Sequence, residues 1–359
     1  YKVFVPPSYD GTPLPLLVDL HGCGSNADEE ARWSRFNTLA AARRMLVAYP
    51  EQDPAANGSR CWNWFLPAHQ SRDAGEPSII AGITRAVMAR WKADPRAVYL
   101  AGISAGGAMS DNMVATYPDL YAAAMVYAGC EYKGTTCTGG PAALPADVSG
   151  QLAYEAMGPR ARVVPVMVIQ GDLDPVVPAY NAELVVQQFL ATDDRADDGV
   201  NNASISRTRS ATRQGAKPGG ESYEIDEYTD GARCLVARRW LVRGMLHQWS
   251  NAESNGTPRD VALTDPDGPD VSNPTLDFLL AYRMPTAGKT CSAALAAPPV
   301  AVTPAPAPAG PRTGGGPDGP PETLAVGGGS GANRVGLLAL VGFVVLRMHR
   351  RRRPGLRRT

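Results

Sequence analysis

The chain has 359 residues, of which 44% are hydrophobic, and its formal net charge at pH 7 is zero. This length suits one large domain or two ordinary ones, and the apolar fraction supports a sizeable buried core. Residues 293–359 contain nine Arg and two acidic residues, so the rest of the chain is mildly acidic. That balance excludes the basic footprint of a nucleic-acid-binding protein, and no nucleic-acid partner is expected.

Apolar runs alternate with helical patterns along residues 1–292, which predicts a single α/β domain with a mostly parallel sheet between helices. Strands are expected at Tyr1–Pro6, Leu14–Leu20, Met45–Tyr49, Ala97–Gly102, Ala122–Tyr127, Val163–Gln170, Ser222–Tyr228 and Ala237–Val242. Helices are expected at 28–44, 76–92, 105–116, 179–191 and 273–282. Residues 293–333 are mainly Ala, Pro and Gly, which predicts a disordered linker.

The C-terminal segment 334–359 joins an apolar run at 335–346 to an Arg cluster at 350–353. A helix over that run would extend about 18 Å, short of the roughly 30 Å hydrocarbon core of a bilayer. The segment is similar to bacterial C-terminal sorting signals, although it has no LPxTG sequence. We therefore expect it to sort or anchor the protein at a membrane or the cell envelope; a chance apolar patch is the alternative.

Six cysteines stand at positions 23, 61, 130, 137, 234 and 291, without a CxxC pair, and the four histidines are scattered. This spacing does not suit a metal site, and an even count favours disulfides and an oxidising, extracellular compartment. Six buried thiols are the alternative. The chain begins at Tyr1, so any signal peptide is expected to have been removed.

A G-x-S-x-G motif, Gly102-Ile103-Ser104-Ala105-Gly106, lies between the expected strand 97–102 and a helical pattern that begins at Ala105. In that strand-to-helix turn a serine is exposed above the sheet, and small neighbours let the backbone approach closely. The helix N-terminus stabilises developing negative charge. The context predicts that Ser104 is a nucleophile, and a glycine-rich turn without chemistry is the alternative.

The segment Leu20-His21-Gly22-Cys23-Gly24 ends the expected strand 14–20. In the α/β-hydrolase fold, the loop after this strand supplies one backbone N–H to an oxyanion hole, and the residue after the nucleophile supplies another. The N–H groups of Cys23 and Ala105 are therefore expected to form this hole. We expect His21 to brace the loop rather than to transfer protons.

The catalytic base is expected to follow the acid, which follows the serine, in α/β-hydrolases. Of the histidines at 21, 69, 247 and 349, His247 alone lies after the last candidate strand and before the basic tail. The acid should follow the expected strand 163–170, where Asp172 and Asp174 both stand. Asp174 is favoured by its spacing, and Asp172 is expected to stabilise the local turn.

These motifs resemble the polyhydroxybutyrate (PHB) depolymerase family of esterases, which includes feruloyl and acetylxylan esterase-like members. The resemblance covers nearly all of residues 1–285 and rests on LHGCG, YPEQ, CWNWF, GEPSIIAGI, AGISAGGAMS, YPDLYAA, GDLDPVVP and GMLHQW. It implies the α/β-hydrolase fold, no cofactor, and a triad of Ser104, Asp174 and His247. Members often carry Gly-His-Ala-Trp-Ser-Gly around the histidine, whereas this chain has Leu-His-Gln-Trp-Ser-Asn at 246–251.

Aromatic residues near the motifs predict the wall of a substrate pocket, with Trp62, Trp64 and Trp249 as candidates and core packing as the alternative. A Cys23–Cys61 disulfide is expected to pin the oxyanion loop to this wall, with Cys130–Cys137 and Cys234–Cys291 as the other pairs. The sequence thus predicts a secreted serine esterase acting on a polyester or oligoester. Feruloyl or acetylxylan ester hydrolysis, a serine peptidase and a catalytically idle binding scaffold are the alternatives.

Overall fold

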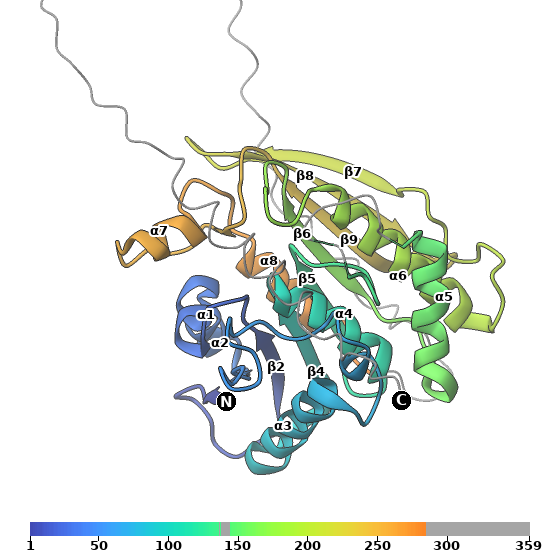
Figure 1. Ribbon diagram of the computed structural model, residues 1–359, viewed down its shortest axis with the longest axis horizontal. Helices are drawn as coiled ribbons and strands as arrows, with labels where there is room; N and C mark the ends of the chain where they lie inside the picture. Colours follow the sequence, from blue (N-terminus) through green and yellow to red (C-terminus); the bar gives the residue numbers. More distant parts are fainter. Residues whose placement is uncertain (136, 138–143, 285–359) are drawn as a thin grey trace, which may run out of the picture. The chain divides into compact units, whose positions relative to one another are not determined.

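The computed structural model describes residues 1–135, 137 and 144–284 (Figure 1). A short parallel pair, β10 (Trp249–Ser250) and β11 (Thr264–Asp265), is separate from the main sheet, whose strand order is β1-β3-β2-β4-β5-β6-β9-β8-β7. The strands are β1 (Lys2–Phe4), β2 (Leu14–Leu20), β3 (Leu46–Tyr49), β4 (Ala93–Gly102), β5 (Ala123–Tyr127), β6 (Val166–Gly171), β7 (Ala211–Ala216), β8 (Ser222–Thr229) and β9 (Leu235–Val242). Strands from β3 to β9 in this order are parallel, and β1, β8 and β7 are antiparallel to their neighbours. This is the expected α/β-hydrolase architecture.

Helices cover both faces of the sheet. They are α1 (Ala27–Ser34), α2 (Phe36–Arg43), α3 (Gly75–Trp91), α4 (Ala105–Thr116), α5 (Ala146–Met157), α6 (Tyr180–Asp198), α7 (Pro258–Leu263) and α8 (Ser272–Leu280). Successive residues of β2 alternate between two apolar cores: Leu16 and Val18 belong to the core that includes residues of α3, α4 and α6, while Leu17 belongs to the core that includes residues of α1, α2 and α8. Burial on both faces explains why the central strands read as continuous apolar runs.

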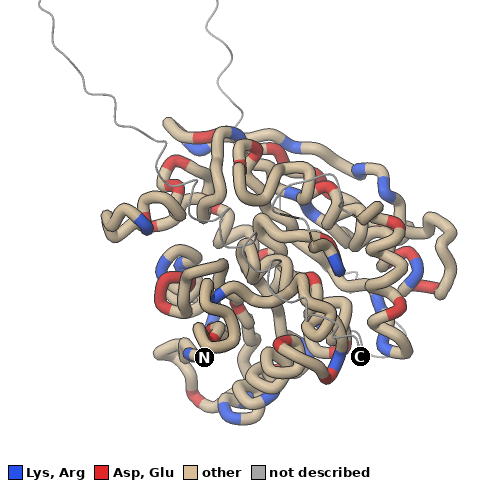
Figure 2. Tube along the Cα trace, viewed as in Figure 1, with Lys and Arg blue, Asp and Glu red and all other residues tan. Residues whose placement is uncertain are grey.

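Charged residues also occur in the sheet, where β8 and β9 pair. Figure 2 marks the charged positions along the chain. Arg239 Nε donates to Asp226 Oδ2 at 3.1 Å, and Arg238 Nε donates to Glu227 Oε1 at 3.0 Å. All four residues are buried and stand opposite one another in register. Each buried charge therefore has a partner, which makes these polar positions compatible with strands.

Several elements differ from those expected. The helix expected at 28–44 is divided at Arg35, whose φ of 57° lies in the left-handed region. Helix α5 was not expected, because Gly150 interrupts its helical pattern. A Cβ at Gly150 would lie 2.5 Å from the Ala191 Cβ, so the glycine permits α5 to pack closely on α6. Strand β7 was also missed, because its partly exposed edge position selects polar residues instead of an apolar alternation.

Two of the expected disulfides are present, Cys23–Cys61 and Cys130–Cys137, and Cys234 is also disulfide-bonded. Its expected partner Cys291 lies outside the described residues, as do the expected linker 293–333 and the segment 334–359. Within 1–135 and 144–284, no helix has both the length and the apolarity needed to cross a bilayer.

Candidate active site

The candidate site lies where parallel strands end at one edge of the sheet. Strand β2 leads into the loop that starts at His21, β4 leads into Ser104, β6 is followed by Asp174, and β9 is followed by the loop that carries His247. Because β2, β4, β6 and β9 all run in the same direction, these four segments emerge at the same edge. Ligands of α/β sheets bind beyond this carboxyl edge.

Ser104 occupies a strained turn between β4 and α4. Its φ of 58° and ψ of −121° lie outside the conformations that non-glycine residues ordinarily adopt. Two hydrogen bonds stabilise this backbone conformation: the Ser104 N–H donates to the Tyr127 carbonyl at 2.8 Å, and the Ser104 carbonyl accepts from the Ala108 N–H at 2.9 Å. The result is the sharp turn that places a serine above the sheet.

Close packing explains both glycines of the motif. A Cβ on Gly106 would lie 1.9 Å from the Leu20 carbonyl oxygen, and a Cβ on Gly102 would lie 2.5 Å from the Gly106 carbonyl carbon. A side chain at Gly106 would push the turn away from the end of β2, and one at Gly102 would push the start of α4 away from the end of β4. Gly106 therefore lets the serine turn contact the loop that follows β2, and Gly102 lets the turn itself be tight.

The expected oxyanion loop lies directly against this turn. A Cβ on Gly22 would stand 3.2 Å from the Ser104 Cβ, so the chain passes beside the serine just before Cys23. Ala105 is the first residue of α4, where backbone N–H groups have no partner within the helix. Among the hydrogen bonds of the described residues, neither the Cys23 nor the Ala105 N–H donates to protein. The expectation that these two N–H groups face an oxyanion therefore stays a prediction, and neither is occupied by a protein acceptor in the described residues.

His21 braces the oxyanion loop, as expected. Its fully buried ring pairs Nδ1 with the Gly22 carbonyl at 2.7 Å, and Nε2 accepts from the Gln52 N–H at 3.0 Å. Burial lowers the pKa of His21, so the ring stays neutral and keeps Nε2 as an acceptor. Both ring nitrogens are therefore occupied by hydrogen bonds to backbone groups.

The buried histidine predicts a loss of stability in mild acid. Because the folded-state pKa of His21 lies below the usual 6.5, the unfolded chain takes up this proton first as pH falls. We expect the free energy of unfolding to decrease below about pH 6.5, with one site contributing at most about 1.4 kcal/mol per pH unit. Urea unfolding across this range should show a shallower decline for His21→Gln than for the wild type. Equal slopes would contradict this role.

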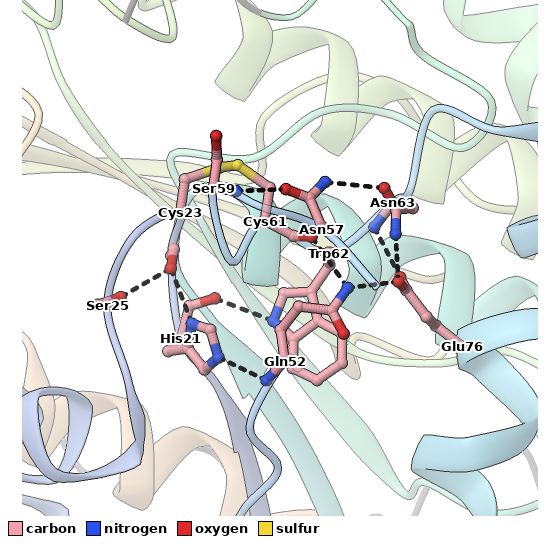
Figure 3. Close-up of a disulfide and its surroundings, with 11 residues drawn as sticks. His21, Cys23, Ser25, Gln52, Asn57, Ser59, Cys61, Trp62, Asn63 and Glu76 are labelled. Atoms are coloured by element: carbon pink, nitrogen blue, oxygen red, sulfur yellow. Dashed lines mark hydrogen bonds between the residues drawn. A yellow bond between two sulfur atoms is a disulfide. The ribbon is translucent and has the colours of Figure 1, made fainter. Parts of the chain in front are cut away.

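A network behind the oxyanion loop connects it to the start of α3 (Figure 3). Glu76 is buried and accepts from the Asn63 N–H and from Asn63 Nδ2, each at 2.6 Å, and from Gln52 Nε2 at 2.5 Å. The Gln52 backbone N–H in turn donates to His21. The Cys23–Cys61 disulfide joins the same two segments. Hydrogen bonds and a covalent bond therefore fix the oxyanion loop to the segment 52–63.

Removing this disulfide should lower turnover as well as stability. The Cys23–Cys61 pair spans 38 residues and the Cys130–Cys137 pair spans 7. Chain entropy assigns them about 4 and about 2 kcal/mol respectively. For Cys23→Ser/Cys61→Ser we expect kcat to fall about tenfold, because a mobile oxyanion donor stabilises the transition state less well.

The matched control is Cys130→Ser/Cys137→Ser, which loses a disulfide that does not include a residue of the oxyanion loop and should keep kcat within about threefold. Ester hydrolysis assays and urea unfolding of both double variants make the comparison. Equal losses of kcat would show that the first disulfide has no special link to the site.

Asp174 and His247 form a hydrogen-bonded pair. The distance from His247 Nδ1 to Asp174 Oδ2 is 2.7 Å. Asp174 is held in place by the N–H groups of Val176 and Val177, both at 2.8 Å, and by Gln170 Nε2 at 3.0 Å. The Asp174 side chain is fully buried, whereas the His247 side chain retains 14% exposure. This arrangement leaves Nε2 of the imidazole to accept a proton from a nucleophile.

Asp172 has a different environment. Its Oδ1 accepts from the Gly244 N–H at 2.7 Å, and its Oδ2 lies 3.5 Å from Arg243 Nη1. These contacts hold the start of the loop that carries His247, which agrees with the local role expected for Asp172. Among the hydrogen bonds of the described residues, His247 has one to Asp174 and none to the Ser104 hydroxyl.

A family model described as esterase PHB depolymerase matches residues 1–218, which is more than half of the chain. The chain belongs to this family. The matched region contains the oxyanion loop, Ser104 and Asp174, while His247 follows it along the chain. The resemblance drawn from the sequence motifs is thereby confirmed.

Similar proteins include several kinds of esterase. Poly(3-hydroxyalkanoate) depolymerase C of Paucimonas lemoignei is 40% identical over 124 residues, or 34% of this chain and 29% of that protein. An acetylxylan esterase of Coprinopsis cinerea is 36% identical over 116 residues, or 32% of this chain and 30% of that protein. The chain thus spans less than a third of the length of either relative.

One solved structure supports the fold. The acetyl xylan esterase from Aspergillus awamori superimposes with a TM-score of 0.55 at 21% identity, covering 68% of this chain and 87% of that one. The PHB depolymerase family member described here therefore shares the α/β-hydrolase fold with it.

The aromatic wall expected from the sequence is mostly buried. Trp62 is 3% exposed and its Nε1 donates to the His21 carbonyl at 3.0 Å. Trp249 is fully buried, and its Nε1 donates to Ser272 Oγ at 3.0 Å. Neither side chain is available to line an open pocket, which corrects the expectation for both. Trp64 is partly exposed, so its place in the pocket wall stays a prediction.

Several supporting residues were missed at the sequence level. Gln52 and Glu76 lie within the YPEQ and GEPSIIAGI motifs, so the resemblance marked their segments without indicating that they brace the oxyanion loop. Gln170, the penultimate residue of β6, contacts Asp174. A polar residue at the end of an otherwise apolar strand was the signal available for Gln170.

Proposed function

We propose that this family member is a serine esterase that hydrolyses carboxylic esters through an acyl-enzyme. Ser104 Oγ attacks the carbonyl carbon while His247 Nε2 takes its proton, and the carbonyl oxygen becomes an oxyanion facing the N–H groups of Cys23 and Ala105. The imidazolium then protonates the departing alcohol oxygen as the carbon–oxygen bond breaks. Water then attacks the carbonyl carbon of the acyl-enzyme while His247 takes its proton, and this releases the carboxylic acid and restores Ser104.

The observation that carries the proposal is the 2.7 Å hydrogen bond between His247 and Asp174 at the sheet edge that also holds the strained Ser104 turn. Asp174 fixes the imidazole tautomer and stabilises its protonated form, and it keeps its own charge throughout. The three residues come from separate segments of the chain. Their convergence supports a catalytic assignment more strongly than any of the motifs alone.

The proposed substrate is a polyester or oligoester of hydroxyalkanoic acids. The 40% identical segment of poly(3-hydroxyalkanoate) depolymerase C supports this class. A second candidate is an ester on plant polysaccharide, supported by the acetylxylan esterase and by feruloyl esterase B of Neurospora crassa, which is 34% identical over 119 residues. All these substrates present the same ester carbonyl and differ in the groups on either side of it.

Turnover of matched esters tests the proposal. p-Nitrophenyl acetate and butyrate report general esterase activity, while hydroxybutyrate oligomers, acetylated xylan and methyl ferulate separate the substrate classes. We expect the highest kcat/KM on hydroxybutyrate oligomers and labelling of Ser104 by a fluorophosphonate. Preference for acetylated xylan or methyl ferulate would favour the second candidate. A protein that neither turns over an ester nor reacts with the fluorophosphonate would be an idle scaffold.

We also propose that the enzyme is secreted and associates with the cell envelope through residues 334–359. The disulfides in the described part of the chain support an oxidising compartment. Fractionation of cells producing the full chain, compared with a version ending at Ala332, tests the tail. Retention of only the full chain in the envelope is the expected result, and equal release of both forms would exclude an anchoring role.

A further inference from the structure

Tyr127, the last residue of β5, lies between the two segments that carry the proposed nucleophile and base. Its backbone carbonyl accepts the Ser104 N–H at 2.8 Å, and Tyr127 also forms a bridge with Ile103. The residue is therefore part of the support that holds the strained serine turn. Its side chain is fully buried and extends toward the loop after β9.

The hydroxyl of Tyr127 contacts the His247 loop on both sides of the histidine. It donates to the Gln248 carbonyl at 2.8 Å and accepts from the Ser250 N–H at 3.0 Å. Met245 Sδ, two residues before His247, lies 3.5 Å from the same oxygen. A single buried oxygen thus fixes the backbone of the segment that presents the imidazole.

Ring packing makes this support rigid. The Tyr127 ring contacts Trp249 with 5.1 Å between ring centroids, and Trp249 packs edge-on against Phe36 at 5.7 Å. Burial raises the pKa of Tyr127 well above its ordinary value, so the hydroxyl remains protonated and able to donate. A change of the Tyr127 χ1 angle would carry the hydroxyl away from both partners and open space in a packed core.

We propose that Tyr127 is a positioning residue that sets the separation between Ser104 and His247. This inference rests on the proposed function. Because no hydrogen bond joins the Ser104 hydroxyl to His247 in the described structure, their relative placement depends on the framework behind them. Tyr127 contacts both parts of that framework, through its backbone on the serine side and through its hydroxyl on the histidine side.

Tyr127→Phe removes the hydroxyl and keeps the ring and the backbone contact. Since a displacement of about 1 Å can cost about 100-fold in rate, we expect kcat for p-nitrophenyl acetate to fall about 10- to 100-fold with KM within about twofold. The rate of fluorophosphonate labelling at Ser104 should fall in parallel. Amide hydrogen exchange at Ser250 should accelerate, because its acceptor is lost.

Tyr99→Phe is the matched control. Tyr99 lies on the neighbouring strand β4, is equally buried, and donates its hydroxyl to the Tyr282 carbonyl at 2.8 Å. The control therefore loses the same kind of buried hydrogen bond, and we expect it to retain kcat within about twofold.

Different outcomes separate the two proposals. An active wild type with Tyr127→Phe within about twofold of its kcat would overturn the positioning role alone. Equal loss of kcat in Tyr127→Phe and Tyr99→Phe would also overturn it, since the effect would then reflect general destabilisation. A wild type that shows neither ester turnover nor labelling would overturn the proposed function and the positioning role together.

Discussion

Ser104→Ala is expected to lower kcat for p-nitrophenyl acetate by about 10⁴-fold or more, because it removes the proposed nucleophile of the acyl-enzyme. The folded state should be nearly unchanged, since Ser104 is partly exposed and alanine meets the same backbone strain at this turn. His247→Ala should lose a similar factor, and combining the two changes should add little, because triad members act as a unit. Steady-state kinetics and thermal unfolding of the three variants test this.

Ser110→Ala provides the control for the nucleophile. Ser110 is a buried serine of α4 whose hydroxyl donates to the Gly106 carbonyl at 2.8 Å, so it lies near the same turn without an assigned part in the chemistry. Its removal should leave kcat within about threefold of the wild type. Retention of more than about a tenth of wild-type turnover by Ser104→Ala would refute the assignment.

Asp174→Asn is expected to lower kcat by about 10⁴-fold, while Asp172→Asn should stay within about threefold. An amide at position 174 can donate to the imidazole and favour the wrong tautomer, and it cannot stabilise the imidazolium. Asp172 instead accepts from the Gly244 N–H, which an asparagine oxygen also does. The two substituted residues stand only two positions apart in the chain, so steady-state kinetics of both variants test directly which one is the catalytic acid. A reversed order of effects would show that the acid is Asp172.

The fold was largely predictable because the central strands are buried on both faces. β2 was expected and found at Leu14–Leu20, and α4 was expected at 105–116 and found at Ala105–Thr116. Both elements adjoin the strongest motifs, where glycine positions and apolar periodicity indicate the same structure. The departure at Arg35 was not predictable from composition, because an arginine in the left-handed conformation is stabilised by tertiary packing and not by local preference.

The sequence predicted which segments of the chain contribute to the candidate site, but it predicted less well which side chains are exposed there. The hydrogen bond between His247 and Asp174 accords with the expected pairing, because chain order restricts which acid and histidine can meet. Trp62 and Trp249 were placed in a pocket because tryptophan suits both pockets and cores, and sequence position alone does not distinguish burial from exposure. Tyr127 gave no motif signal, since its contacts depend on where the loop after β9 lies relative to the end of β5.

The order of segments along the chain also has a consequence for biosynthesis. The proposed base follows the proposed nucleophile by 143 residues, and β9 must pair with β6 before the loop carrying His247 has a fixed place. At ribosomal rates of about 5–20 residues per second, this interval lasts about 7–30 s. Throughout it the nascent polypeptide has a serine turn and no partner histidine. Under the proposed function, the polypeptide cannot hydrolyse an ester until the segment that carries His247 has been synthesised and placed.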